Sequence, residues 1–179
     1  MQRSQDISGV NTMSETDQLQ AKKDFLENLK QMPFLDSFEE KDLNKFLTLS
    51  KLKQYEAGEF IIDEKFYDSW IYFLVSGTVR IVKQGKELRV LRRRGDIFGE
   101  MAIIDGSERS ASAYAIAETV CLSIDVSYLD RLPDNEKSVF YSVLYKSFAE
   151  ILAERLRLTT EELVEARKEI ERLKGTVSE

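Results

Sequence analysis

The most informative part of the sequence is residues 98–115, which read FGEMAIIDGSERSASAYA. In its first half, a glycine and an acidic residue are followed by an apolar run. This pattern predicts one or two helical turns over residues 99–104. Asp105, Gly106 and Ser107 are typical turn residues, and the chain is then expected to enter a new strand over residues 108–111. The segment interrupts the strand pattern on either side of it, which makes it the candidate binding segment.

The residue types in this segment suit a ligand that carries a phosphate and a sugar. A helix N-terminus presents unpaired N–H groups and partial positive charge, which favour an anion. Arg109 follows ten residues after Gly99, and its forked guanidinium can hold two phosphate oxygens, with the Ser110 hydroxyl beside it. Glu100 can accept a hydrogen bond from a sugar hydroxyl, as acids do toward ribose in other folds. A plainer alternative stays open, in which Glu100 and Arg109 pair with each other and stabilise the turn.

Outward from this segment, short apolar runs alternate with polar residues and are separated by glycines. The runs are residues 60–62, 70–75, 78–82, 88–91 and 120–124. A period of two with glycine punctuation predicts antiparallel strands in a small sandwich or barrel. Gly58, Gly77 and Gly95 are expected to form the tight turns, because glycine adopts backbone angles that other residues resist.

Helical patterns flank the strands on both sides. Apolar residues at helical spacing predict one helix within residues 19–32 and a second over residues 39–50. No glycine or proline interrupts residues 134–174, which predicts one long helix. The predicted fold class is α+β, and the predicted organisation is a disordered tail over 1–17, N-terminal helices with an antiparallel β-barrel over 18–133, and a long C-terminal helix over 134–179.

Composition narrows the function classes. The chain has 179 residues, a net charge of -6 and no histidine, which excludes a Ser-His-Asp nucleophile and His-ligated zinc or haem. Cys121 is the single cysteine, so it cannot form an intrachain disulfide or hold an iron–sulfur cluster by itself. The longest apolar run, residues 70–75, is far shorter than the roughly 20 residues of a membrane-spanning helix. We therefore expect a cytoplasmic binding protein that is not an enzyme, with no metal, no cofactor and no membrane contact.

The segment resembles the phosphate-binding cassette of the cyclic nucleotide-binding domain family. The family pattern is Phe-Gly-Glu, an apolar stretch, a turn, and then Arg followed by a small residue and Ala, which correspond here to residues 98–100, 101–104 and 109–111. Further similarity lies at Tyr55 and at residues 57–59, 61–62, 72–77 and 95–96, so that the resemblance covers about residues 32–160. One departure is residues 63–67, where many members have a glycine-containing turn.

The resemblance implies a jelly-roll β-barrel and gives each cassette residue a role. Glu100 would hold the ribose 2′-hydroxyl, and Arg109 would hold the exocyclic oxygens of a cyclic phosphate. The rest of the phosphate cradle would come from the residues around them, Gly99, Met101, Ala102, Ser110 and Ala111. The implied ligand is cAMP, with cGMP as the alternative.

The last helix carries an unbroken heptad seam. Its seam positions are spaced alternately four and three residues apart, at Tyr145, Ala149, Leu152, Leu156, Thr159, Leu163, Ala166, Ile170 and Leu173. In a parallel pair, Glu162 would face Arg167 of the partner subunit, and Glu169 would face the partner's Lys174. The sequence thus predicts a parallel homodimeric coiled coil. The alternative, an amphipathic helix packed on its own barrel, explains the apolar stripe of residues 140–151 but not the seam beyond it.

Thr159 and Thr160 place polar, β-branched residues within this seam. Residues 154–161 resemble the dimer helix of bacterial catabolite activator proteins, in which a Thr-Ser pair contacts adenine. The resemblance implies that Thr159 and Thr160 contact the base, one of them from the partner chain. Activators of that kind continue into a DNA-binding domain, whereas this sequence ends in a charged helical tail at Glu179, so we expect no direct DNA binding.

A basic cluster lies between Arg80 and Arg94, where seven Lys and Arg residues accompany one acid. It is either a solvated hairpin or a surface for an acidic partner or an anionic ligand. The sequence as a whole predicts a cyclic nucleotide-binding regulatory module that dimerises through its C-terminal helix and relays binding to an unknown downstream protein. Two alternatives stay open: a coiled-coil assembly module with an idle nucleotide pocket, and the sensor half of a truncated DNA-binding transcription regulator.

Overall fold

The computed structural model of the protein describes residues 32–176. The helices are the 3-10 helix η1 (Pro33–Ser37), α2 (Glu40–Leu49), α3 (Met101–Asp105), α4 (Val126–Leu129) and α5 (Asp134–Thr176). The strands are β1 (Lys51–Tyr55), β2 (Phe60–Ile62), β3 (Trp70–Ser76), β4 (Val79–Lys83), β5 (Lys86–Leu91), β6 (Ile97–Phe98), β7 (Ser112–Ala115) and β8 (Thr119–Asp125). The predicted tail and the apolar positions of the first predicted helix lie outside the described residues.

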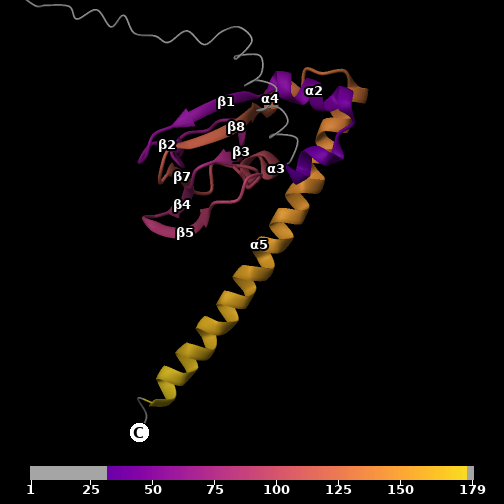
Figure 1. Cartoon of the computed structure of the whole chain (residues 1–179). Coiled ribbons are helices and arrows are strands. Elements are labelled where there is room, and N and C mark those ends of the chain that lie inside the picture. The colour runs from indigo at the N-terminus through magenta and orange to yellow at the C-terminus, as the bar shows by residue number, and fades with distance from the viewer. Residues whose placement is uncertain (1–31, 177–179) are drawn as a thin grey trace, which may run out of the picture.

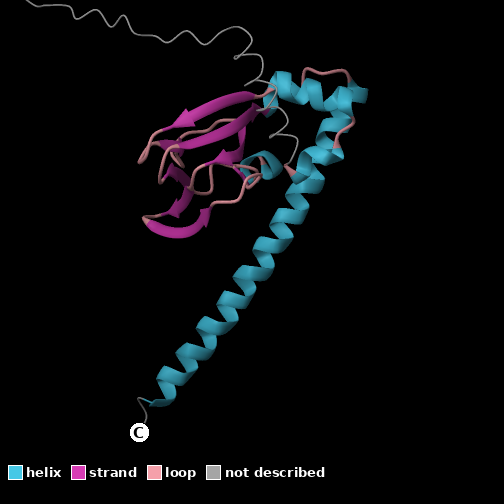
Figure 2. Ribbon diagram, in the orientation of Figure 1, coloured by secondary structure: helices cyan, strands magenta, loops and turns pink. Residues whose placement is uncertain are grey.

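The strands form two antiparallel sheets of four strands each (Figure 2). Their orders are β1-β8-β3-β6 and β2-β7-β4-β5. The inner faces of the two sheets pack together, since Leu74 and Cys121 of the first share one apolar cluster with Val79 and Ala113 of the second. The predicted jelly-roll fold with flanking helices is confirmed. Within residues 32–176 the barrel takes the form of two facing sheets and does not close into one continuous ring.

The outer face of the β1-β8-β3-β6 sheet is covered by helices. Side chains alternate across a strand, so Tyr72 and Leu74 of β3 point between the sheets while Ile71 and Phe73 point toward the helices. Burial on both faces explains why β3 reads as a continuous apolar run. In Figure 1, α2, α4 and the start of α5 gather at one end of the strands.

The long helix α5 changes character along its length. Its first turns pack on the sheet through buried apolar residues, namely Phe140, Val143, Leu144 and Phe148. From Leu156 to Lys174 every residue is exposed, and this part of α5 extends away from the strands in Figure 1. The predicted long helix is therefore present, and the predicted packing stripe on its own sheets occupies only the first half.

The cassette segment connects the two sheets. It leaves β6, makes a sharp bend at Gly99 with φ +84°, forms α3 and enters β7. The predicted helix and turn are present, and Gly106 ends α3 in the left-handed conformation with φ +65°. The expected start of the new strand at residues 108–111 is wrong, because the β4–β7 ladder begins only at the Val82–Ser112 pair. Arg109 therefore lies in the bend before β7.

We expect replacement of Phe46 by alanine to destabilise the fold strongly. Phe46 is fully buried, and its ring lies 5.7 Å from that of Phe34, 5.8 Å from Phe73 and 6.2 Å from Phe140. The cavity left behind should lower the free energy of unfolding by about 3–5 kcal/mol, measured by urea denaturation. Leu52→Ala is the control, because Leu52 is half exposed and its removal should cost less than about 1 kcal/mol. Equal losses in the two variants would contradict this account of the core.

Candidate functional site

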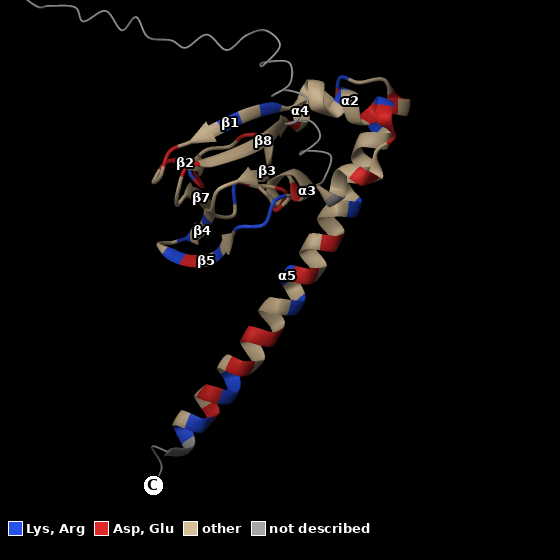
Figure 3. Ribbon diagram, in the orientation of Figure 1, with Lys and Arg blue, Asp and Glu red and all other residues tan. Residues whose placement is uncertain are grey.

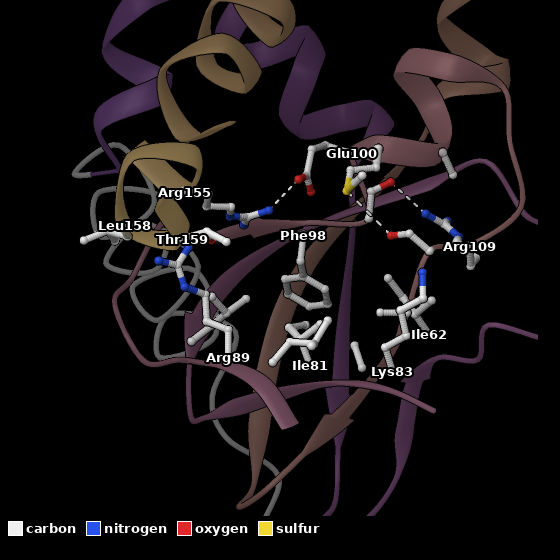
Figure 4. A pocket seen from close by; sticks show the side chains of 18 of the residues that line it. Ile62, Ile81, Lys83, Arg89, Phe98, Glu100, Arg109, Arg155, Leu158 and Thr159 are labelled. Atoms are coloured by element: carbon white, nitrogen blue, oxygen red, sulfur yellow. Dashed lines mark hydrogen bonds and ion pairs between the residues drawn. The ribbon is translucent and has the colours of Figure 1, made fainter. Parts of the chain in front are cut away.

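A cavity of about 380 Å³ lies between the β2-β7-β4-β5 sheet, the cassette segment and α5. Eight of the nine predicted site residues line it: Gly99, Glu100, Met101, Ala102, Arg109, Ser110, Ala111 and Thr159. Apolar side chains of Ile62, Ile81 and Phe98 form part of its wall. Figure 4 shows Glu100 between Arg155 on one side and Arg109 on the other. The structure thus brings the cassette and α5 to one cavity.

Arg109 is a buried cation with a nearly complete set of partners. Only 5% of the residue is exposed. Its Nη1 donates to the carbonyl oxygen of Gly99 at 2.7 Å, and its Nη2 donates to the carbonyl oxygen of Trp70 at 2.6 Å and forms an ion pair with Asp68. Its Nε is buried without a partner among the described residues. The guanidinium is therefore held firmly at the cavity wall through both Nη atoms, while Nε is uncommitted among the described residues.

Gly99 is required by the close approach of Arg109. A Cβ atom at this position would lie 2.9 Å from Nη1 of Arg109 and 3.0 Å from Cδ1 of Ile62. Its φ of +84° also lies in a region that other residues rarely adopt. A larger residue here would therefore move either the arginine or the bend that leads into α3.

Glu100 pairs with an arginine that the sequence did not single out. The residue is 1% exposed, and its Oε1 accepts from Nη1 of Arg155 on α5. The other end of the Arg155 fork donates to the carbonyl oxygen of Ile97. The alternative in which Glu100 and Arg109 pair with each other is therefore wrong, since Arg109 pairs with Asp68. Both carboxylate–arginine pairs join the cassette to another part of the chain.

Asp68 and Arg155 are the two partners of the Arg109 and Glu100 side chains that sequence reasoning missed. Asp68 follows directly after residues 63–67, the one loop that departs from the family pattern, so that departure was the available signal. For Arg155 the signal was its position four residues after Ile151, which ends the apolar stripe of α5. One helical turn beyond Ile151, the same face reaches the cassette.

The far end of the cavity from Arg109 is formed by the β4–β5 hairpin and α5. Figure 4 shows Arg89 of β5 beside Thr159 on that side. Within residues 32–176 the Arg89 side chain has no ion pair and no hydrogen bond. Thr160 does not line this cavity, and its hydroxyl donates to the carbonyl oxygen of Leu156 at 2.7 Å. Of the two threonines, Thr159 alone faces the cavity of its own chain.

Burial shifts the pKa of several titratable groups on β1, β3 and β8. Burial raises the pKa of Tyr55 to about 12 and raises the pKa of Tyr72 as well. The same cause raises the pKa of the Cys121 thiol to about 12, so this buried thiol is protonated at neutral pH and is not an activated nucleophile. Burial lowers the pKa of Lys53, whose Nζ lies 3.8 Å from the centre of the Trp70 ring.

Comparison with known proteins agrees with the fold and the cassette. Residues 52–136 match the sequence model of the family described as "Cyclic nucleotide-binding domain". Residues 52–136 therefore form a cyclic nucleotide-binding domain, as the cassette resemblance predicted. Over the part of the chain that the structure describes, no helix combines the length and apolar character needed to cross a membrane.

Individual relatives include a protein kinase, a catabolite activator protein and a putative cyclic nucleotide-binding protein. The chain is 32% identical over 133 residues to a cGMP-dependent protein kinase of Toxoplasma gondii, covering 73% of this chain and 13% of that kinase. It is 27% identical to the catabolite activator protein of Thermus thermophilus, with a TM-score of 0.53, covering 76% of this chain and 61% of that one. A putative cyclic nucleotide-binding protein of Geobacter metallireducens shares the fold, with 21% identity, a TM-score of 0.62, and coverage of 71% of this chain and 95% of that one.

Proposed function

We propose that this chain is a cytoplasmic regulatory module that binds a cyclic nucleotide and has no catalytic activity of its own. The observation that supports the proposal is that Glu100 and Arg109 are both buried and line the same cavity. Both residues belong to a cassette whose residues follow the order of the family pattern. In this proposal Glu100 holds the ribose 2′-hydroxyl and Arg109 the cyclic phosphate. The cradle is completed by the other cassette residues that line the cavity, Gly99, Met101, Ala102, Ser110 and Ala111.

The relay to a partner runs through α5. The ribose would contact a Glu100 carboxylate that already forms an ion pair with Arg155 of α5. Nucleotide binding would therefore act on α5 through this carboxylate. A ligand shifts a conformational equilibrium only through contacts that differ between the two states, and the Glu100–Arg155 pair is such a contact. The similarity to a cGMP-dependent protein kinase supports a protein kinase as the class of downstream partner.

Replacing Arg109 tests the nucleotide site. We expect Arg109→Lys and Arg109→Ala to weaken cyclic nucleotide binding, the alanine variant by about 2–5 kcal/mol, or at least about 30-fold. Titration calorimetry with cAMP and cGMP measures the loss. Arg131→Ala is the control, because exposed Arg131 lies against Tyr128 and away from the cavity.

Two outcomes would speak against the proposal. Binding within threefold of the parent in the alanine variant, with a normal melting profile, would remove Arg109 from the site. If the parent chain binds neither nucleotide, the remaining alternative is an assembly module with an idle pocket.

The base that the cavity accepts depends on Thr159 and Arg89. We expect cAMP first, because a threonine hydroxyl both donates and accepts and so can meet the adenine edge, which carries a donor and an acceptor. Arg89 favours cGMP as a second candidate. Its guanidinium, which has no partner among residues 32–176, stands beside Thr159. Guanine presents two acceptors, O6 and N7, that match such a fork.

Variants of these two residues separate the candidates. Arg89→Ala should reduce affinity for cGMP about tenfold more than for cAMP, because a bidentate arginine–guanine pair contributes roughly 1–3 kcal/mol. Thr159→Val should change the affinity ratio in the opposite direction. Arg80→Ala serves as the matched control, since Arg80 belongs to the same hairpin but does not line the cavity. An unchanged ratio of the two affinities in both variants would show that neither side chain reads the base.

We further infer a parallel homodimer through α5. Along the predicted seam Leu156 is 70% exposed, and Leu163, Ile170 and Leu173 are each about half exposed. Single exposed apolar residues are ordinary on a protein surface, whereas a heptad row of them is typical of a coiled-coil interface. Thr160, which points away from its own cavity, would then be available to the partner's cavity.

A charge in the seam should separate the dimer. Leu163→Lys combined with Ile170→Lys places four like charges in the paired helices, and sedimentation should show monomers. Val164→Lys is the matched control, because Val164 is similarly exposed but lies next to the seam. We expect this control to remain dimeric. A persistent dimer in the double variant would move the interface away from α5.

A further inference from the structure

A second cavity, of about 300 Å³, lies beside the first one. It is formed by the end of β5, the loop of residues 92–96 and α5. Arg89, Leu91 and Arg155 line both cavities and so form the partition between them. The described residues that line the second cavity include none of the cassette residues 98–111. Figure 3 shows the basic stretch that leads from β5 through this loop toward α5.

The lining of this cavity has an excess of positive charge. Four arginines accompany two carboxylates; they are Arg89, Arg92, Arg93 and Arg155, with Asp96 and Glu154. Because Arg155 is paired with Glu100 of the first cavity, one positive charge remains in excess. Because the whole chain carries a net charge of -6, this local excess is unlike the average surface and points to an anionic ligand.

The two carboxylates are largely occupied by other groups. Asp96 Oδ2 accepts the backbone N–H groups of Arg92 at 3.1 Å and Arg93 at 2.9 Å. Glu154 lies 4.0 Å from Arg93 across the mouth of the cavity, which is a long and exposed contact of little energy. Over the described residues the side chains of Arg89 and Arg92 form no ion pair. Arg155 is paired with Glu100, and Arg93 lies 3.7 Å from Asp96 as well as near Glu154. Arg89 and Arg92 are therefore the arginines of this cavity that have no carboxylate partner among the described residues.

We propose that the second cavity binds a small anion that carries a phosphate group, held chiefly by Arg92 and Arg93. A phosphate monoester dianion neutralises two positive charges, and forked guanidinium groups bind its oxygens in pairs. The volume is at the lower end of small-molecule sites, roughly 300–1,000 Å³, which favours a small molecule over a peptide segment. Arg92 and Arg93 do not line the nucleotide site proposed above, although Arg89, Leu91 and Arg155 line both cavities, and this proposal does not depend on that function.

Inorganic pyrophosphate is the probe for this site. It is titrated into the chain at constant ionic strength while backbone amide resonances are followed by NMR. We expect saturable shifts centred on residues 92–96 and 151–155. Arg92→Gln combined with Arg93→Gln should weaken binding at least tenfold, because both forks are lost while the backbone bonds to Asp96 remain.

The matched control removes the same amount of charge from the same hairpin. Arg80→Gln combined with Lys86→Gln alters residues outside both cavities, and pyrophosphate binding should stay within twofold of the parent. Equal losses in the two double variants would show general electrostatic attraction and overturn the proposal. Shifts centred on residues 99–111 would place the anion in the first cavity and also overturn it. If a triglutamate peptide binds as tightly as pyrophosphate, the site does not select phosphate, and the proposal of a phosphate ligand is overturned in favour of an acidic peptide.

Discussion

The burial of the Arg109 charge is the constraint on which the site depends. A guanidinium removed from water is stable only when its N–H groups and its charge are satisfied. Here the compensation comes from three places: the Gly99 carbonyl of the cassette, the Trp70 carbonyl at the start of β3, and the Asp68 carboxylate in the loop before it. The bend at Gly99 and the course of the loop before β3 are both set by the position of this one cation.

A second buried pair joins the cassette to the long helix. Glu100 and Arg155 are 55 residues apart in the sequence, and the Arg155 fork also holds the carbonyl oxygen of Ile97 just before the bend. Removing either member of a buried pair leaves the other charge uncompensated, which costs roughly 3–5 kcal/mol. The orientation of α5 beside the cavity is therefore coupled to whatever competes for the Glu100 carboxylate.

The local sequence pattern predicted most of the fold and much of the cavity lining. It did not predict contacts between residues that are far apart in the sequence. The alternation in β4 and β8, the continuous apolar run of β3, the glycine turns and the unbroken helix after Pro133 are all properties of neighbouring residues, and each was predictable. Asp68 lies in a loop without periodicity, and Arg155 lies 55 residues from its partner, so local periodicity alone predicts neither pairing. Thr160 shows a different limit, because consecutive helical residues point about 100° apart. Both threonines of one chain therefore could not face the same cavity.

The geometry of α5 explains how one helix can serve both a ligand and a partner. The face of α5 that packs on the sheet continues along the helix through Ile151 and Arg155 to Thr159 and Glu162. Arg155, Thr159 and Glu162 of this face line the cavity. The heptad seam follows an adjacent line, in which Thr159 lies between Leu156 and Leu163. Thr159 is thus the position where the two lines meet, since it belongs to the cavity wall and to the seam. In the proposed dimer, a change in the rotation of α5 about its axis would move this residue relative to both, and this would couple occupancy of the cavity to pairing of the helices.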